Sequence, residues 1–227
     1  MINNNEERRC SNAVSRAIDN LNNSNFTLMN DSFGNVVLDV KDASLIWTNF
    51  AGTPNNFTQM NNLDQFGKDI RSFNLAITPE IADKLMKEGW NVRAYETNRP
   101  DYPVIHHIKV NVKIANPKTY DETKAFASSV YLITNFNGQE ASQKLENDAL
   151  TILDGRRMSN DDPQINIKKV NCVITGRKYH PANNRNAAQK ITIQLTSMFV
   201  YADQIDIYSD PHEAELARMA VKTDYNR

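Results

Sequence analysis

The sequence has very little cysteine and no long apolar segment, which removes several classes of protein at once. Only Cys10 and Cys172 occur in 227 residues, too few for a disulfide framework or a zinc site. No run of about eighteen apolar residues is present, so we expect no membrane-spanning helix. The first residues are rich in asparagine and lack the basic and apolar regions of a secretory signal. These absences predict one domain with reduced thiols inside a cell.

The common catalytic and metal-binding motifs are missing as well. The four histidines belong to no H-E-x-x-H motif, and neither a phosphate-binding loop nor a G-x-S-x-G turn occurs. His106 and His107 are adjacent in a segment with β pattern, so they would point to opposite faces and could not bind one metal together. The sequence therefore favours a protein that is not an enzyme and needs no cofactor and no metal.

What the sequence does contain is an uneven distribution of charge. The net charge is only -1, yet residues 41–201 hold twenty Lys and Arg against sixteen acids, while residues 202–227 hold three against six. Within 165–201 there are six basic residues and no acidic one. A basic module followed by an acidic tail is typical of proteins that bind polyanions.

The hydrophobic pattern predicts a mainly β protein. Because strands outnumber helices and do not alternate regularly with them, we expect an antiparallel barrel with inserted helices and not a doubly wound parallel sheet. The segment 36–50 fits one long strand or two strands joined by a bend. Five principal strands are expected at 36–50, 71–77, 104–114, 165–175 and 190–201, shorter β segments at 90–95 and 129–134, and helices at 78–89 and 139–154.

The helix at 78–89 has the most complete local signals. Thr78 can cap its start, Pro79 occupies the first helical position, and Gly89 can take the left-handed position after its end. Its apolar side should pack against the barrel through Ile81, Leu85 and Met86.

Both ends of the chain are expected to be flexible extensions. Residues 1–35 are predicted to form an Asn-rich arm, although the spacing of Val14, Ile18 and Leu21 also fits a short amphipathic helix over 6–21. Residues 204–227 form a tail in which 211–220 has helical character. The domain itself is expected at 36–203.

Cationic and aromatic side chains predict a nucleic-acid site. A single strand is bound without sequence preference by cations along a groove and by aromatic planes that stack on bases. We expect Tyr179, with Phe57 or Tyr95, to stack, and the predicted loop 176–189 to face a polar row on the strand 104–114. The candidate binding residues are Lys68, Arg71, Arg93, Tyr95, His107, Lys109, Lys113, Arg177, Lys178, Tyr179, Arg185 and Lys190.

A structural explanation of the same residues is also open. Tyr179 could simply belong to a hairpin, and the lysines could maintain solubility. The remaining large apolar side chains are expected in the core, among them Trp47, Phe50, Phe73, Trp90, Met198 and Phe199.

Four segments resemble bacteriophage-encoded single-stranded-DNA-binding proteins. They are R-S-F-N-L-A-I at 71–77, L-M-K-E-G-W-N-V-R at 85–93, I-H-H-I-K-V-N-V at 105–112 and T-S-M-F-V at 196–200. The resemblance covers roughly residues 37–203. It implies an OB-fold, here a five-stranded antiparallel barrel with a helix after the second strand. It also implies coating of single-stranded DNA during phage replication or recombination in the host cell cytoplasm, and no catalytic residues.

Two other functions remain as alternatives. A phage virion structural or assembly protein with a small β-barrel would self-associate and show no salt-sensitive binding to oligonucleotides. A recombination or nuclease component would show metal-dependent turnover, which the missing acidic cluster disfavours. Single-stranded DNA is the expected partner, together with phage or host replication and recombination proteins and further copies of the chain.

Overall fold

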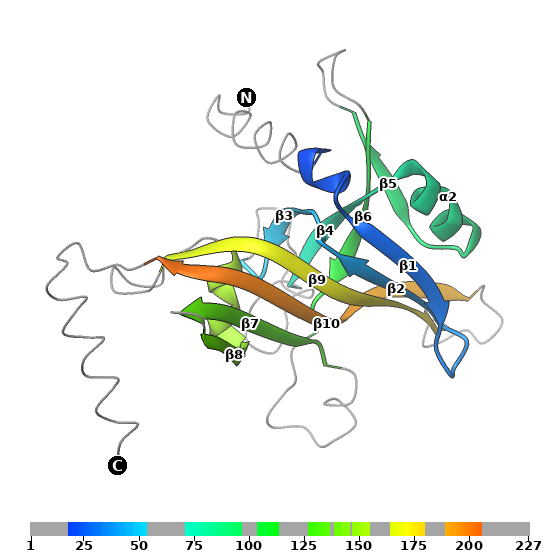
Figure 1. Cartoon of the computed structure of the whole chain (residues 1–227). Helices are drawn as coiled ribbons and strands as arrows, with labels where there is room; N and C mark the ends of the chain where they lie inside the picture. The colour runs from blue at the N-terminus through cyan, green and yellow to red at the C-terminus, as the bar shows by residue number, and fades with distance from the viewer. Residues whose placement is uncertain are drawn as a thin grey trace, which may run out of the picture.

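The protein is mainly β, as the hydrophobic pattern predicts. The computed structural model describes residues 18–53, 71–96, 104–113, 127–136, 139–145, 147–154, 164–179 and 189–205. These residues form one sheet of ten strands. Two strands of sixteen residues each, β9 and β10, run side by side through the molecule, with α2 toward one end and β7 and β8 toward the other (Figure 1).

The elements follow one another along the chain in this order: β1 (Asn25–Asn30), β2 (Val36–Lys41), β3 (Leu45–Asn49), β4 (Ser72–Ile77), α2 (Pro79–Lys87), β5 (Val92–Tyr95), β6 (Ile105–Asn111), β7 (Ser129–Phe136), β8 (Gln139–Leu145), the 3-10 helix η2 (Asn147–Asp154), β9 (Gln164–Tyr179) and β10 (Lys190–Ile205). The segment 36–50 is thus two strands joined by a bend. Residues 18–21 form a short helical turn before β1.

The sheet differs from the expected five-stranded antiparallel barrel. Its strands are ordered β1-β2-β9-β10-β6-β4-β3, with β5 paired to β6, β7 paired to β10, and β8 paired to β7. The number of strands was therefore wrong, and so was the uniform direction, because β10 pairs in parallel with both β6 and β7. The terminal strands β1 and β3 do not pair with each other in the described residues, so the sheet remains open there.

Ser128 holds the point where β10 changes partners. Its hydroxyl donates to the Leu195 carbonyl at 2.7 Å and accepts from the Lys113 amide at 3.0 Å. Its own amide donates to the Lys113 carbonyl at 2.8 Å. The end of β6 and the start of β7 are thereby fixed against the middle of β10. The long strand β10 therefore pairs first with β6 and then, further along, with β7.

Helix α2 confirms the predicted capping. The Thr78 hydroxyl accepts from the Ile81 amide at 3.4 Å, and Gly89 has a φ of 81° just after the helix. Ile81, Ala82 and Leu85 are buried against the sheet. Met86, which was expected on this apolar side, is 48% exposed, because it follows Leu85 around the helix and leaves the buried stripe.

The prediction of a helix at 139–154 was wrong. Residues 139–145 form β8, which pairs antiparallel with β7, and only 147–154 are helical, as a 3-10 helix. Leu150 and Leu153 of η2 are buried, and the Asp154 carboxylate accepts from the amides of Phe50 and Ala51 at 3.1 and 2.8 Å. Residues 25–30 also differ from a flexible arm, since they form β1 along the edge of β2.

The sheet has a main core face, and its opposite side is polar along β9 and β10 but carries a second, smaller apolar cluster of Ile46, Ala76 and Ile105. The core face carries Leu38, Phe73, Val110, Ile174 and Leu195, none of them exposed to solvent, and it belongs to one apolar cluster with α2, Trp90 and η2. We call the opposite side the outer face. Alternation and strand register place Lys109, Asn111, Thr175, Arg177 and Gln194 on it.

Candidate nucleic-acid interface

Strand register brings the two predicted cationic groups onto the same face. Gln194 of β10 pairs with Asn111 of β6 on one side and with Thr175 of β9 on the other. Since residues two positions apart share a face, Lys109 and Arg177 both lie on the outer face, one on each side of β10. The expected loop 176–189 is shorter than predicted, because Arg177 already belongs to β9.

The end of the β9–β10 ribbon adds two further predicted residues to this face. Tyr179 pairs with Lys190, and Arg177 pairs with Thr192. Tyr179 is 44% exposed, and the Lys190 side chain is exposed as well. A phenol ring and two cations therefore stand within a few residues of each other on adjacent strands.

The edge of the sheet at β5 carries a second cationic and aromatic pair. Arg93 and Tyr95 pair with His107 and Ile105, so both point to the outer face. Arg93 is exposed and Tyr95 is half-buried. The Tyr95 ring meets the Trp47 ring edge-on, with centroids 5.0 Å apart. Arg93 and Tyr95 therefore lie on the same face as Lys109, on the strand β5 that pairs with β6.

The backbone of Trp47 has an energetically unfavourable conformation. Its φ is 47°, a left-handed value that is unusual for a bulky residue, and it lies in an irregularity between Ile46 and Asn49 where β3 loses register with β4. Backbone conformations of this kind are found disproportionately at functional sites. No local pattern predicted this conformation. Trp47 was expected in the core, and its half-buried side chain packs against the smaller apolar cluster on the outer face.

His107 was predicted as an exposed binding residue and is instead 6% exposed. Its ring meets Trp47 edge-on with centroids 5.1 Å apart, and its Nδ1 lies 3.1 Å from the Asn74 carboxamide oxygen. Burial, with smaller contributions from Arg93 and His106, lowers the pKa of His107. The buried His107 side chain packs against the Trp47 ring and is not available to a ligand.

Arg71 is the second predicted residue that the structure removes from the surface. It is 4% exposed, and its Nη1 donates to the Phe50 carbonyl at 3.0 Å. Phe50 is also held by Asp154 through its amide. Arg71 therefore fixes the chain beyond β3 in the interior, a structural role that its position at the start of a strand did not reveal.

The other predicted residues are placed as follows. Lys113 is exposed just beyond β6. Lys178 points away from the outer face, because it alternates with Arg177, and it lines a cleft of about 520 Å³ with Lys87, Tyr179 and Lys190 at the end of α2. Lys68, Arg185 and Phe57 lie outside the described residues.

Sequence reasoning missed an aromatic group at the other end of β10. Tyr131 and Phe199 are register partners, and their rings stack with centroids 5.3 Å apart and an interplanar angle of 11°. Phe199 was expected in the core, but it is 37% exposed. Tyr201 lies two residues further along, with the Lys169 Nζ 6.0 Å from its ring centroid. Strand register places all four side chains on the outer face.

A β-bulge explains why Phe199 faces outward. Between Leu195 and Ser197 the register of β10 against β9 shifts by one residue. Before the bulge the even-numbered residues 190, 192 and 194 are on the outer face, and after it the odd-numbered residues 197, 199 and 201 are. Because 198–202 are apolar on both faces, simple alternation could not have indicated this change.

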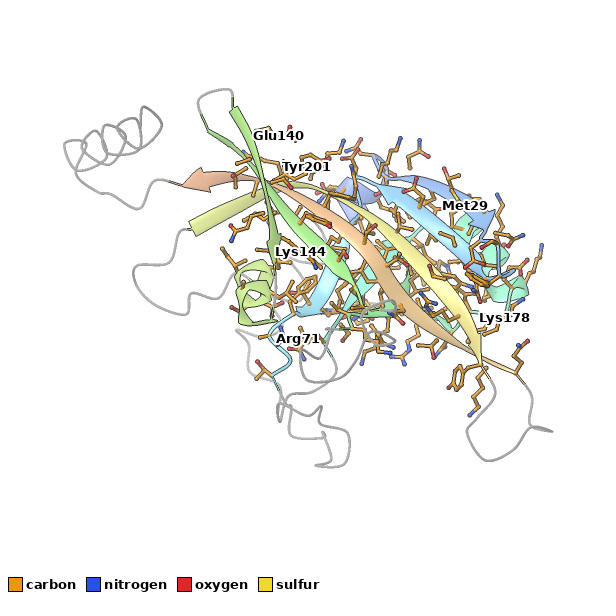
Figure 2. The ribbon with its side chains drawn as sticks, turned by 90° about the horizontal axis from the view of Figure 1, so that it is seen from below. Met29, Arg71, Glu140, Lys144, Lys178 and Tyr201 are labelled. Atoms are coloured by element: carbon orange, nitrogen blue, oxygen red, sulfur yellow. The ribbon has the colours of Figure 1, made fainter. Side chains whose placement is uncertain are left out.

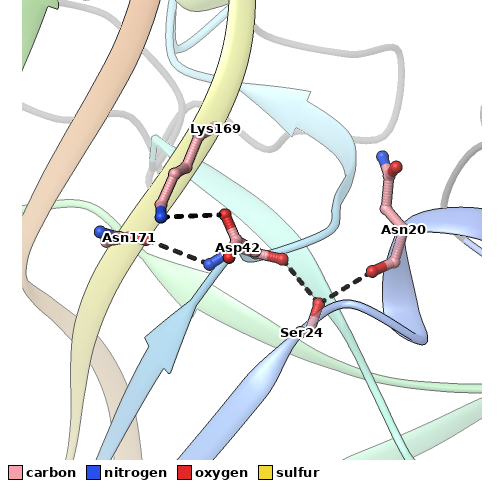
Figure 3. A network of polar contacts seen from close by, with 5 residues as sticks. All are labelled: Asn20, Ser24, Asp42, Lys169 and Asn171. Carbon is pink, nitrogen blue, oxygen red and sulfur yellow. Dashed lines mark hydrogen bonds and ion pairs between the residues drawn. The ribbon is translucent and has the colours of Figure 1, made fainter.

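Two acidic side chains near the outer face, Asp42 and Asp31, are held by an ion pair or by hydrogen bonds. Asp42 lies 3.4 Å from the Lys169 Nζ, and its amide donates to the Asn171 carboxamide at 3.1 Å (Figure 3). Its carbonyl lies 2.6 Å from the Ser24 hydroxyl. Such an exposed ion pair is weak, so Lys169 can exchange it for another anion.

Asp31 is held in the same way, in the turn between β1 and β2. It accepts from the amides of Phe33 and Asn35 at 2.9 and 2.8 Å. The Asn35 carboxamide is the largest cause that lowers the pKa of Asp31, and the nearby charge of Arg177 lowers it slightly further.

In the described part of the chain no helix has the length and apolarity needed to cross a bilayer. Within the same residues, no three His, Cys, Asp or Glu side chains gather as they would around a metal ion.

Comparison with known proteins gives one family. A family model described as "Putative phage ssDNA-binding domain" matches residues 33–225. No curated protein sequence and no solved structure matches the chain significantly. The matched range spans most of the 227 residues and confirms the resemblance that the strand and helix motifs indicated. The chain therefore belongs to the family of phage single-stranded-DNA-binding domains.

Proposed function

We propose that this protein binds single-stranded DNA without sequence preference on the outer face of its sheet. The observation that carries the proposal is the shared face of β6, β9 and β10, which presents Lys109, Arg177 and Lys190 together with Tyr179. Cations hold the phosphates, and aromatic rings stack on the bases, whose flat faces are common to all four nucleotides. The family match supports this partner.

The chemistry of this face is that of binding and not of catalysis. Thr175 and Gln194 are buried, at 5% and 7% exposed, and the partly exposed polar residues between the cations are Asn74, Asn111 and Thr192. Such groups donate to phosphate and sugar oxygens and to base edges. We infer that the protein acts in phage DNA replication or recombination by coating exposed single strands in the host cell, as an OB-like binding surface on a larger sheet.

The test is fluorescence anisotropy with a labelled oligo-dT and with duplex of equal length, each at two salt concentrations. Oligo-dT should bind more tightly, and log K should fall by about 0.7 per neutralised phosphate for each decade of salt. Lys109→Gln and Lys190→Gln should each reduce this slope, because each removes an exposed cation from the outer face.

The matched control is Lys84→Gln, which removes the same charge from α2 on the other side of the sheet. Equal loss in all three variants would mean that only net charge matters, and it would refute the assignment of the face. A protein that forms rings or tubes and shows no salt-sensitive binding would instead be a virion assembly component.

A further inference from the structure

We infer that the Tyr131–Phe199 stack, with Tyr201, Lys144 and Lys169 around it, is a second base-stacking subsite. This inference rests on the proposed binding of single-stranded DNA. It places the path of one strand along the whole β9–β10 ribbon, from Tyr179 at one end to Tyr201 at the other. Figure 2 shows Tyr201 and Lys178 toward opposite ends of this ribbon.

The Tyr131–Phe199 stack leaves aromatic surface exposed that can contact a base. Tyr131 and Phe199 are nearly parallel, at 11°, and Phe199 leaves 37% of its surface exposed. The large rings that serve the core behave differently: Phe50 and Phe73 stack on each other and are at most 1% exposed. A stacked aromatic pair on an outer face presents a flat apolar surface, which is what a base requires.

Cations flank the stack where phosphates would pass. Lys144 is the register partner of Tyr131 on β8, and Lys169 is the register partner of Tyr201 on β9. Both lysines are exposed, and the ion pair of Lys169 with Asp42 is a surface pair. An apolar protein partner would not require these cations, whereas sites for single-stranded nucleic acid combine aromatic rings with cations along the backbone.

The stack lies on the same face as the cationic group at the other end of the ribbon, and the buried Thr175 and Gln194 lie between them. From Tyr179 to Lys169 the strand β9 keeps the same alternation, so the two ends of the ribbon present the same side to solvent. Ten residues of strand span about 33 Å at ~3.3 Å per residue. At the duplex spacing of ~3.4 Å per nucleotide this length corresponds to roughly ten nucleotides, and to fewer if the strand is extended.

The experiment compares oligo-dT of about twenty nucleotides with an abasic oligonucleotide of equal length, which has the same phosphates and no bases. Both are titrated against the full chain and against the double variant Tyr131→Ala/Phe199→Ala. Loss of one stacked base should weaken oligo-dT binding about fivefold or more. Binding of the abasic strand should change less than about twofold, because its phosphate contacts remain.

The control variant is Phe33→Ala, which removes an aromatic ring that is 87% exposed in the turn between β1 and β2, outside the ribbon. It should bind both oligonucleotides as the unchanged protein does. Circular dichroism is used to check that the double variant keeps its sheet. If it does not, the milder Phe199→Leu, which removes only the aromatic plane, replaces it in the same comparison.

The outcomes separate the two proposals. If the unchanged protein fails to bind oligo-dT, the proposed function is wrong. If it binds, and the double variant binds oligo-dT equally well or loses the same factor on both oligonucleotides, the stacking subsite is wrong while the proposed function stands. A double variant that changes only the oligomeric state in size-exclusion chromatography would assign the stack to contact between copies of the chain and overturn the inference.

Discussion

Replacing Gly176 with alanine should destabilise the protein at the contact between Trp90 and β9. A Cβ at Gly176 would lie 2.6 Å from the Cε2, Cζ2 and Nε1 atoms of Trp90. Real Cβ contacts are essentially never shorter than 3.0 Å. Trp90 follows α2 directly and is 3% exposed, so its ring cannot move aside without disturbing the core beneath the helix.

The expected loss is toward the upper part of the range for overpacked cores, about 2–3 kcal/mol, because the clash involves a rigid indole and not the end of a flexible chain. For a chain of this size, each kcal/mol lowers Tm by about 2–4 °C, so Tm should fall by roughly 4–12 °C. Arg177, the next residue of β9, should shift with the strand, and binding of oligo-dT should weaken as well.

Urea unfolding of a double-mutant cycle isolates this contact. Trp90→Phe makes room for the new methyl group, so the combined variant should be less destabilised than the sum of the two single variants. Gly34→Ala is the control: its φ is 75° and no atom lies within 4 Å of the added Cβ, so it should cost about 1–2 kcal/mol from the backbone alone and add independently to Trp90→Phe. Additive effects for Gly176→Ala, or no effect, would refute the reasoning.

Three further predictions concern stability and reactivity. Burial lowers the pKa of His107, so near neutral and mildly acidic pH the unfolded chain binds a proton that the folded protein does not bind. The free energy of unfolding should therefore fall as the pH drops below about 6.5. In urea titrations His107→Gln should flatten this pH dependence, whereas His106→Gln should not. Burial raises the pKa of Cys172 to about 12, so in a Cys10→Ser background a thiol reagent should label it only as fast as the protein opens, and fast labelling under native conditions would contradict the packing. Thr78→Ala should reduce the free energy of unfolding by about 1 kcal/mol through loss of the cap of α2, whereas Thr78→Ser should change it little; an equal loss in both would assign the effect to the methyl group.

The sequence predicted those helices and strands that carry their caps and apolar pattern within their own residues. Helix α2 has its cap, its buried stripe and its glycine inside twelve residues, and β4 and β6 bury apolar residues as their patterns indicated. Strand β8 has no such signal, because residues 140–144 are all exposed. An edge strand of this kind is stabilised by its ladder with β7, and the apolar spacing of Leu145, Ala149 and Leu153 imitated a helix instead.

The sequence predicted the kind of side chains at the candidate site better than it predicted which of them are exposed there. Charge counts and strand alternation placed Lys109 on a polar face, and the structure puts it on the outer face with Arg177. Burial of Arg71 and His107 depends on contacts with Phe50 and with Trp47, which come from distant parts of the sequence. No pattern along a single strand contains that information.

The bulge in β10 shows why a residue's face can depend on a single position in a ladder. Without the extra residue between Leu195 and Ser197, the even-numbered row of β10 would continue outward, and Met198 and Val200 would face solvent while Phe199 faced the core. With it, the two buried side chains stay in the core and the aromatic ring joins the cationic face of the first half. Neither half of β10 determines this alone. Leu195 and Met198 are three positions apart, so both can face the core only if the bulge takes up one residue between them. The bulge is therefore the local feature that allows a single sixteen-residue strand to carry both cations and stacking rings on one side.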